Sequence, residues 1–158
     1  MPVHKLTMIA TAAVLTVASV AYAGSHLTQT QQRAMNARQS QMQLNGFNIG
    51  ALGAMVQERI PYDAETAAAA AANLAALASI DQTRYWVDGT DSSVEGSRAK
   101  PEIWTDMDGF RAANASLGEA TVALAAVAGD GLDAMKAAFG PVGQSCASCH
   151  EAYRVPNN

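Results

Sequence analysis

The chain has 158 residues, and its ten lysines and arginines against fourteen aspartates and glutamates give a formal net charge of −4. This balance lacks the basic excess of nucleic-acid-binding domains, so we predict no nucleic-acid partner. The length suits one domain with one hydrophobic core.

The first 23 residues are typical of an export signal. A short basic segment, His4 and Lys5, precedes an apolar run that ends in a small-residue cleavage site at Ala23. The apolar run is shorter than the roughly 20 residues of a membrane-spanning helix. We predict a secretory signal peptide over residues 1–23 and a mature chain, residues 24–158, in the periplasm without stable membrane insertion. The alternative is an uncleaved N-terminal anchor.

The mature sequence is predicted to be helical. Alanine is abundant, β-branched residues are sparse, and no long stretch alternates with period two. A first helix is expected from about Thr28 to Arg59, and Pro61 ends it. Asp63 is a good N-cap for a second helix, which runs to about Ser79.

A polar segment over residues 81–100 forms the one long connection. Pro101 then falls at the first position of a third helix, where proline is favoured. Gly129-Asp130-Gly131 separates this helix from a fourth, which runs to about Arg154.

Pro141 interrupts the predicted fourth helix. A proline inside a helix removes a backbone hydrogen bond and clashes with the preceding turn, at a cost of about 3 kcal/mol if unrelieved. Either the helix kinks there, or a short helix ends at Phe139 and another begins at Pro141.

Apolar side chains recur along the predicted helices at spacings of three and four residues, as in packed helical bundles. The stripes of the last two helices are Ile103, Met107, Phe110, Asn114, Leu117, Thr121 and Leu124, and then Leu132, Met135, Phe139, Val142, Cys146, Cys149 and Tyr153. Because moderate connections make neighbouring helices antiparallel, we predict an all-α, antiparallel, up-down-up-down four-helix bundle.

Cys146-Ala147-Ser148-Cys149-His150 is the attachment motif of a c-type haem. The two thiols add to the haem vinyl groups, and the histidine becomes an axial iron ligand. On a helix the three side chains share one face. A thioredoxin-like pair would need a preceding strand, and a zinc site would need more ligands. We therefore predict one covalent haem c, placed in the bundle core near one end because the cysteines lie on an apolar stripe.

The chain resembles cytochrome c′ and its low-spin c556-type relatives, the class II cytochromes c, over nearly the whole of residues 24–158. The matching segments are Arg38-Gln39-Ser40-Gln41-Met42, Pro61-Tyr62-Asp63, Lys100-Pro101-Glu102-Ile103-Trp104, and residues 138–143 running into residues 146–154. A C-x-x-C-H motif near the C-terminus, followed by Tyr-Arg, is specific for this class. The sequence departs from the family at Pro141, where an acidic residue is more frequent, and at residues 85–89, where a Gly-Pro-Gly turn is frequent.

The resemblance implies roles for individual residues. His150 would be the proximal iron ligand, with Arg154 along the proximal haem edge. Arg38 would pair with a haem propionate, accompanied by Gln39, and the alternative for Arg38 is a solvated surface charge. Trp86 would pack against the haem, or pack in the loop without touching it.

The resemblance also places Met42 over the distal haem face. In c556-type relatives a methionine here binds iron through sulfur, which makes an electron-transfer centre. In high-spin cytochromes c′ the side chain only packs over a five-coordinate iron, and the apolar face admits NO and CO but excludes anions and water. A plain core-filling methionine is the third possibility.

We therefore expect a periplasmic c-type haem protein that resembles cytochrome c′, with a His-ligated high-spin haem that binds NO or CO and takes part in electron transfer. The alternative is a low-spin electron carrier with Met42 as sixth ligand. No constellation of titratable groups indicates an enzyme. Redox partner proteins are expected, and the resemblance adds a possible homodimer through the first two helices.

Overall fold

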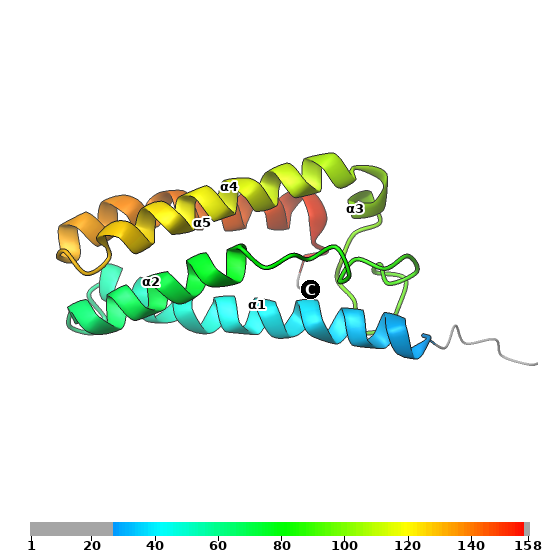
Figure 1. Cartoon of the computed structure of the whole chain (residues 1–158), viewed down its shortest axis with the longest axis horizontal. Helices are drawn as coiled ribbons and strands as arrows, with labels where there is room; N and C mark the ends of the chain where they lie inside the picture. The colour runs from blue at the N-terminus through cyan, green and yellow to red at the C-terminus, as the bar shows by residue number, and fades with distance from the viewer. Residues whose placement is uncertain (1–26, 157–158) are drawn as a thin grey trace, which may run out of the picture.

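The computed structural model describes residues 27–156, so the predicted signal peptide and its cleavage site lie outside the described residues. Four long helices run alternately up and down, and a short one lies at one end (Figure 1). The helices are α1 Gln29–Val56, α2 Ala64–Ala78, α3 Glu102–Thr105, α4 Met107–Val127 and α5 Leu132–Tyr153. The predicted all-α up-down-up-down bundle is confirmed. No helix within residues 27–156 is both long and apolar enough to span a bilayer.

Side-chain caps fix where the first two helices begin. The Thr28 hydroxyl accepts a hydrogen bond from the backbone N–H three positions on, and the Asp63 carboxylate does the same for α2. Both starts agree with the sequence prediction. α1 ends at Val56, earlier than predicted, and Glu58 just beyond it has a left-handed backbone with φ 54°.

The prediction of one continuous third helix is wrong. The chain forms the short α3, leaves the helical conformation at Asp106 (φ −132°, ψ 52°), and begins α4 at Met107. The Asp106 carboxylate accepts a hydrogen bond from the Gly109 backbone N–H at 3.1 Å, which caps the new helix. The apolar stripe continues across this break, so periodicity alone could not reveal it.

The last helix runs through Pro141 without ending, so of the two alternatives the single helix is correct. Pro141 has no backbone N–H, so it cannot donate the helical hydrogen bond to the carbonyl of Ala137. Both residues are exposed, so water can reach the carbonyl that is left without its helical partner.

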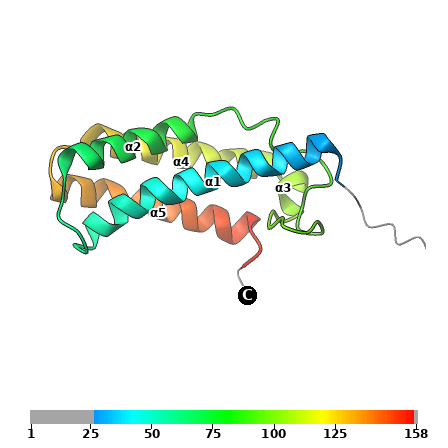
Figure 2. The ribbon, with the colours of Figure 1, turned by 90° about the horizontal axis from the view of Figure 1, so that it is seen from below.

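The four long helices form a ring in which α1 packs on α2 and α5, and α4 packs on the same two. α2 has 15 residues and α1 has 28, so α2 covers only part of α1 and the connection to α3 covers the rest (Figure 2). The buried core lies where all four helices overlap, and its larger members are Leu52, Met55, Leu74, Leu124, Met135 and Val142. The other end, which carries α3, is left for a cavity.

Candidate haem site

A cavity of about 620 Å³ lies at the α3 end, between α1, the long connection, α4 and α5. Its volume is in the range of sites that enclose a cofactor or drug-sized ligand. All eight residues that the sequence analysis proposed for the site line it: Arg38, Gln39, Met42, Trp86, Cys146, Cys149, His150 and Arg154. Segments more than a hundred residues apart in the chain thus meet around one space.

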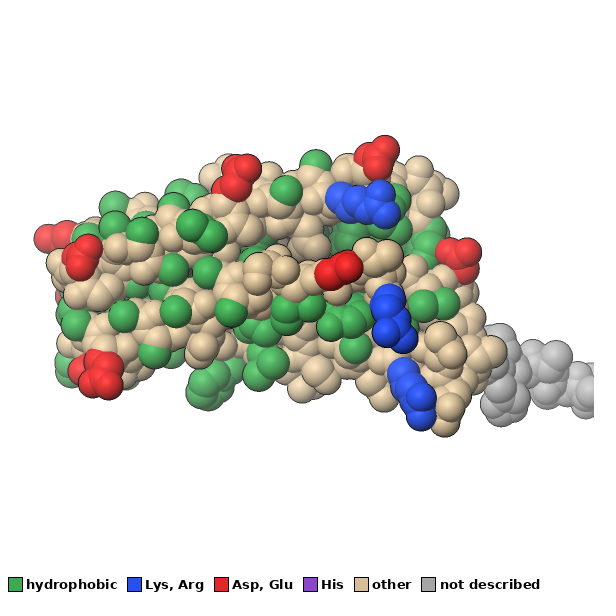
Figure 3. Space-filling view, viewed as in Figure 1, with side chains coloured by type: hydrophobic (Ala, Val, Ile, Leu, Met, Phe, Trp, Pro, Cys, Tyr) green, Lys and Arg blue, Asp and Glu red, His purple; other side chains and the backbone are tan. Residues whose placement is uncertain are grey.

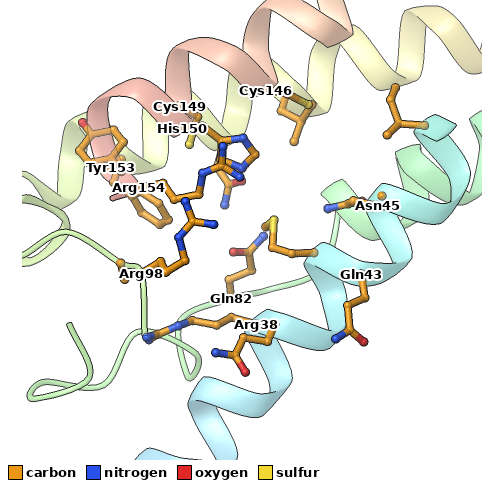
Figure 4. A pocket seen from close by; sticks show the side chains of 18 of the residues that line it. Arg38, Gln43, Asn45, Gln82, Arg98, Cys146, Cys149, His150, Tyr153 and Arg154 are labelled. Carbon is orange, nitrogen blue, oxygen red and sulfur yellow. The ribbon is translucent and has the colours of Figure 1, made fainter. Parts of the chain in front are cut away.

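Cys146, Cys149 and His150 form the α5 wall of the cavity (Figure 4). Their spacing puts them on one side of the helix, and all three side chains are half-buried. Burial raises the pKa of both thiols. Burial first, and then the nearby charges of Arg154 and Arg98, lowers the pKa of His150. The imidazole is therefore neutral at pH 7, and a neutral imidazole is the form that binds a metal.

α1 forms the facing wall, with Arg38, Gln39 and Met42. The Gln39 side-chain amide donates a hydrogen bond to the Gly96 carbonyl at 2.8 Å, so it ties α1 to the connection. Met42 lines the cavity although 42% of its surface is exposed. Its side chain therefore borders the cavity and is not packed into the buried core.

Arg38 is buried, with 5% of its surface exposed, and it holds the long connection against α1. Its guanidinium donates to the Tyr85 carbonyl (3.3 Å), the Thr90 hydroxyl (2.7 Å), the Thr90 carbonyl and the Ser97 hydroxyl (3.0 Å). Burial lowers the pKa of Arg38, and the charge of Asp91 partly offsets this. The alternative of a solvated surface charge is therefore wrong, and a contact with a haem propionate stays a prediction.

Trp86 is fixed from several sides. Its ring lies edge-on to Phe110, with centroids 4.6 Å apart, and edge-on to Trp104 at 6.3 Å. The Arg38 guanidinium lies 4.9 Å from the ring centroid, a cation–π distance. Trp86 is therefore a rigid part of the cavity wall, and its contact with haem stays a prediction.

The cavity contains more polar side chains than the sequence analysis named. The amide side chains of Gln82, Gln43, Asn45 and Asn114 line it, in addition to Gln39. Asn45 could have been found from the sequence, because it lies three residues after Met42 on the same helical face. Gln82 could not, since it belongs to the irregular connection and no periodicity applies there.

Arg98 is a further residue that the sequence analysis missed. It lines the cavity, and its guanidinium donates through Nε to the Val155 carbonyl at 3.1 Å. Arg98 and Arg154 approach the His150 side of the cavity together (Figure 4), and neither forms an ion pair with any residue of the described range. On the face seen in Figure 3, lysine and arginine side chains also gather toward this end. Two unpaired guanidinium groups suit a ligand that carries carboxylates.

The residues present fit a c-type haem. Two thiols and a neutral imidazole lie on one helix face, a thioether borders the opposite wall, and aromatic and apolar side chains line much of the space between. The guanidinium groups at the rim match the two carboxylates of the cofactor. The fold and this donor set define a c-type cytochrome of the four-helix-bundle class.

Comparison with known proteins narrows this class. The family model for cytochrome c′ matches residues 33–154, and the chain belongs to this family of covalent haem c proteins. A cytochrome c′ from Cereibacter sphaeroides is 38% identical over 125 residues, which cover 78% of this chain and 84% of the relative.

Solved structures agree with the family assignment. The crystal structure of cytochrome c′ from Thermochromatium tepidum superposes with a TM-score of 0.74 at 32% identity, and the match covers 82% of this chain and 98% of that one. A nitric oxide complex of a variant of cytochrome c prime from Alcaligenes xylosoxidans has a TM-score of 0.71 at 34% identity, with 83% and 100% covered. The family-model match, residues 33–154, includes every residue that lines the cavity.

Proposed function

We propose that this protein binds nitric oxide and carbon monoxide at a haem c held by Cys146, Cys149 and His150, and that it also carries electrons. The observation that supports this most strongly is that the two facing walls of the cavity, on α5 and α1, carry different potential iron ligands. α5 presents both thiols and the imidazole, whereas α1 presents only the partly exposed thioether of Met42. When bound, haem supplies a one-electron centre with a coordination position for a small neutral ligand.

Different side chains would hold different parts of this cofactor. The two thiols would fix it to α5, and the neutral His150 imidazole would give its lone pair to the iron. Arg98 and Arg154 would compensate carboxylate charge, while Arg38 keeps the connection closed over the cavity. The relative solved as a nitric oxide complex supports a gas-binding role for this shared architecture.

A second candidate function rests on the same Met42 side chain. Its sulfur lines the cavity from the wall that faces His150, and thioether ligation would give a six-coordinate electron carrier. We favour the open position because several of the matched relatives are named cytochrome c′ and one such relative is solved as a nitric oxide complex.

The kinetics of carbon monoxide binding to the reduced protein distinguish the two candidates. With an open position, the observed rate should rise in proportion to the carbon monoxide concentration and saturate at one ligand per haem. With Met42 bound, the rate should reach a plateau set by loss of the sulfur, and Met42→Leu should abolish the plateau. A plateau in the wild-type protein would refute the open-site proposal.

We place this activity in the periplasm after removal of residues 1–23, with redox proteins as partners. We also propose a homodimer through α1, because Leu44 and Phe47 lie one turn apart on it with 52% and 78% of their surfaces exposed. Light scattering should give a dimer mass for the holoprotein and a monomer mass for Phe47→Ser. A monomeric wild-type protein would refute the dimer.

A further inference from the structure

Gln82 brings a hydrogen-bond donor into the cavity that the proposed function does not use. Only 8% of its surface is exposed, and the residue lines the cavity at the start of the long connection. Its Nε2 donates to no residue in the range 27–156, and the atom itself is accessible from the cavity although the rest of the side chain is buried.

The orientation of the Gln82 amide follows from its neighbour. Trp86 Nε1–H lies 3.3 Å from Gln82 Oε1. An indole N–H can only donate, so the amide oxygen must face Trp86 and the NH₂ group must face away from it. In Figure 4 the Gln82 side chain points into the space between α1 and α5. Because Trp86 itself packs against Phe110 and Arg38, the partner that orients the Gln82 amide is fixed in position.

The cavity that this donor faces is lined by apolar side chains as well as by amides and by the guanidinium groups of Arg38, Arg98 and Arg154. Met42, Leu74 and Leu117 line the same cavity. A ligand that fills this part of the cavity displaces water from the Gln82 N–H, which then loses the hydrogen bonds it would make in water, at a cost of about 1–3 kcal/mol. A ligand with an acceptor atom in this part of the cavity recovers that loss, whereas a ligand without one does not.

We infer that Gln82 is a specificity-determining residue, which donates a hydrogen bond to a small ligand held in the part of the cavity that Met42 lines. This inference rests on the proposed function, because it needs a small ligand in the cavity. The ligands favoured are those whose outer atom accepts a hydrogen bond, namely polarised diatomic molecules and small anions such as cyanide. The donor thus widens the ligand range beyond the neutral gases that an apolar cavity admits.

The test compares wild-type holoprotein with Gln82→Leu, which removes the amide and keeps a side chain of similar bulk. The first readout is the C–O stretching band of the reduced carbon monoxide complex. A donor to the oxygen draws electron density into the ligand and lowers this frequency, so Gln82→Leu should move the band to higher frequency. The second readout is cyanide affinity of the oxidised protein, which should fall about tenfold, the equivalent of 1.4 kcal/mol.

Two matched variants test whether the effect arises from the oriented Gln82 amide. Gln57→Leu makes the same chemical change at the exposed C-cap of α1, and it should alter neither readout. Trp86→Phe removes the N–H that orients the amide, and it should broaden or split the C–O band. The haem absorption spectrum of each variant shows that it folds and holds its cofactor.

The Gln82 experiment is repeated in a Met42→Ala background. If Met42 binds the iron in the wild-type protein, the open-site proposal fails, but the Gln82 effect on the C–O band should persist in this background. Identical bands and cyanide affinities with and without Gln82 in both backgrounds would overturn the inference. If Gln82→Leu leaves the C–O band unchanged but alters the pH dependence of the midpoint potential, the amide donates to a haem propionate. That result would also overturn the inference.

Discussion

The hydroxyl of Tyr153 donates a hydrogen bond to Oδ2 of Asp106 at 2.7 Å. This contact joins the last turn of α5 to the break between α3 and α4. The other carboxylate oxygen, Oδ1, caps the first turn of α4, so one aspartate connects three helices. Tyr153 also packs edge-on against Phe110 with centroids 5.3 Å apart. The C-terminal turn of α5 is thereby attached to the start of α4 just beyond His150.

This hydrogen bond predicts a loss of stability at alkaline pH. The bond to Asp106 raises the pKa of Tyr153 from 10.0 to about 12, because the bond requires the protonated phenol. The native state therefore keeps a proton that the unfolded chain loses near pH 10. The contribution of the bond to stability is complete below pH 10 and disappears as the pH rises to about 12. The melting temperatures of wild type and Tyr153→Phe should converge between pH 10 and pH 12. A difference in melting temperature that stays constant over this interval would show that it does not come from this hydrogen bond.

Replacement of Arg38 should destabilise the fold strongly. Its buried guanidinium makes four hydrogen bonds to the connection. Arg38→Met removes all four, and within residues 27–156 it leaves the Thr90 carbonyl with only the Ser97 hydroxyl as donor and the Tyr85 carbonyl with none. We expect a loss of about 3 kcal/mol in the free energy of unfolding, measured with urea. Arg38→Lys should restore little of the lost stability, because an ammonium group cannot make the several hydrogen bonds that the planar guanidinium makes in different directions.

Arg33 provides the control for this experiment, since it lies on the same helix and is exposed. Arg33→Met should change the unfolding free energy by less than about 0.5 kcal/mol. Equal effects of the two substitutions would argue against the anchoring role of Arg38.

Covalent attachment predicts the behaviour of the cysteine variants. Cys146→Ala should keep one thioether link and Cys146→Ala/Cys149→Ala none. Acid–acetone extraction should therefore remove haem only from the double variant. This variant should also fold poorly, because side chains cannot fill a cavity of about 620 Å³. Haem that stays with the double variant through extraction would disprove the c-type attachment.

Met42→Ala tests the wall opposite His150. If the side chain only packs in the cavity, its removal enlarges the space for a ligand, and carbon monoxide should bind several-fold faster. The spin state of the oxidised protein should stay as in the wild type. A change from low spin to high spin in the variant would instead identify Met42 as an iron ligand.

Local signals made much of the fold predictable. Asp63 and Pro101 mark helix starts by capping and by fixed backbone geometry, and the glycines around Asp130 separate the last two long helices, as observed. The cysteine spacing predicted which face of α5 borders the cavity. These signals involve only a few neighbouring residues, so they can be recognised in a single sequence.

The contacts that shape the rest of the site are long-range. Arg38 and Thr90 are 52 positions apart, and nothing near either residue indicates that they meet. Gln82 and Arg98 lie in a connection without periodicity, so their place on the cavity wall depends on how that connection folds back. Asp106 interrupts an apolar stripe that reads as one helix, because the cap that breaks it needs only one carboxylate and the N–H of Gly109.

An EPR spectrum of the oxidised wild-type protein at neutral pH tests most directly whether the haem has an open coordination position beside Met42. An open position should give an axial high-spin signal, together with an optical spectrum that lacks a sulfur-to-iron charge-transfer band. A rhombic low-spin signal with such a band, both lost in Met42→Ala, would contradict the open position and make the protein a six-coordinate electron carrier.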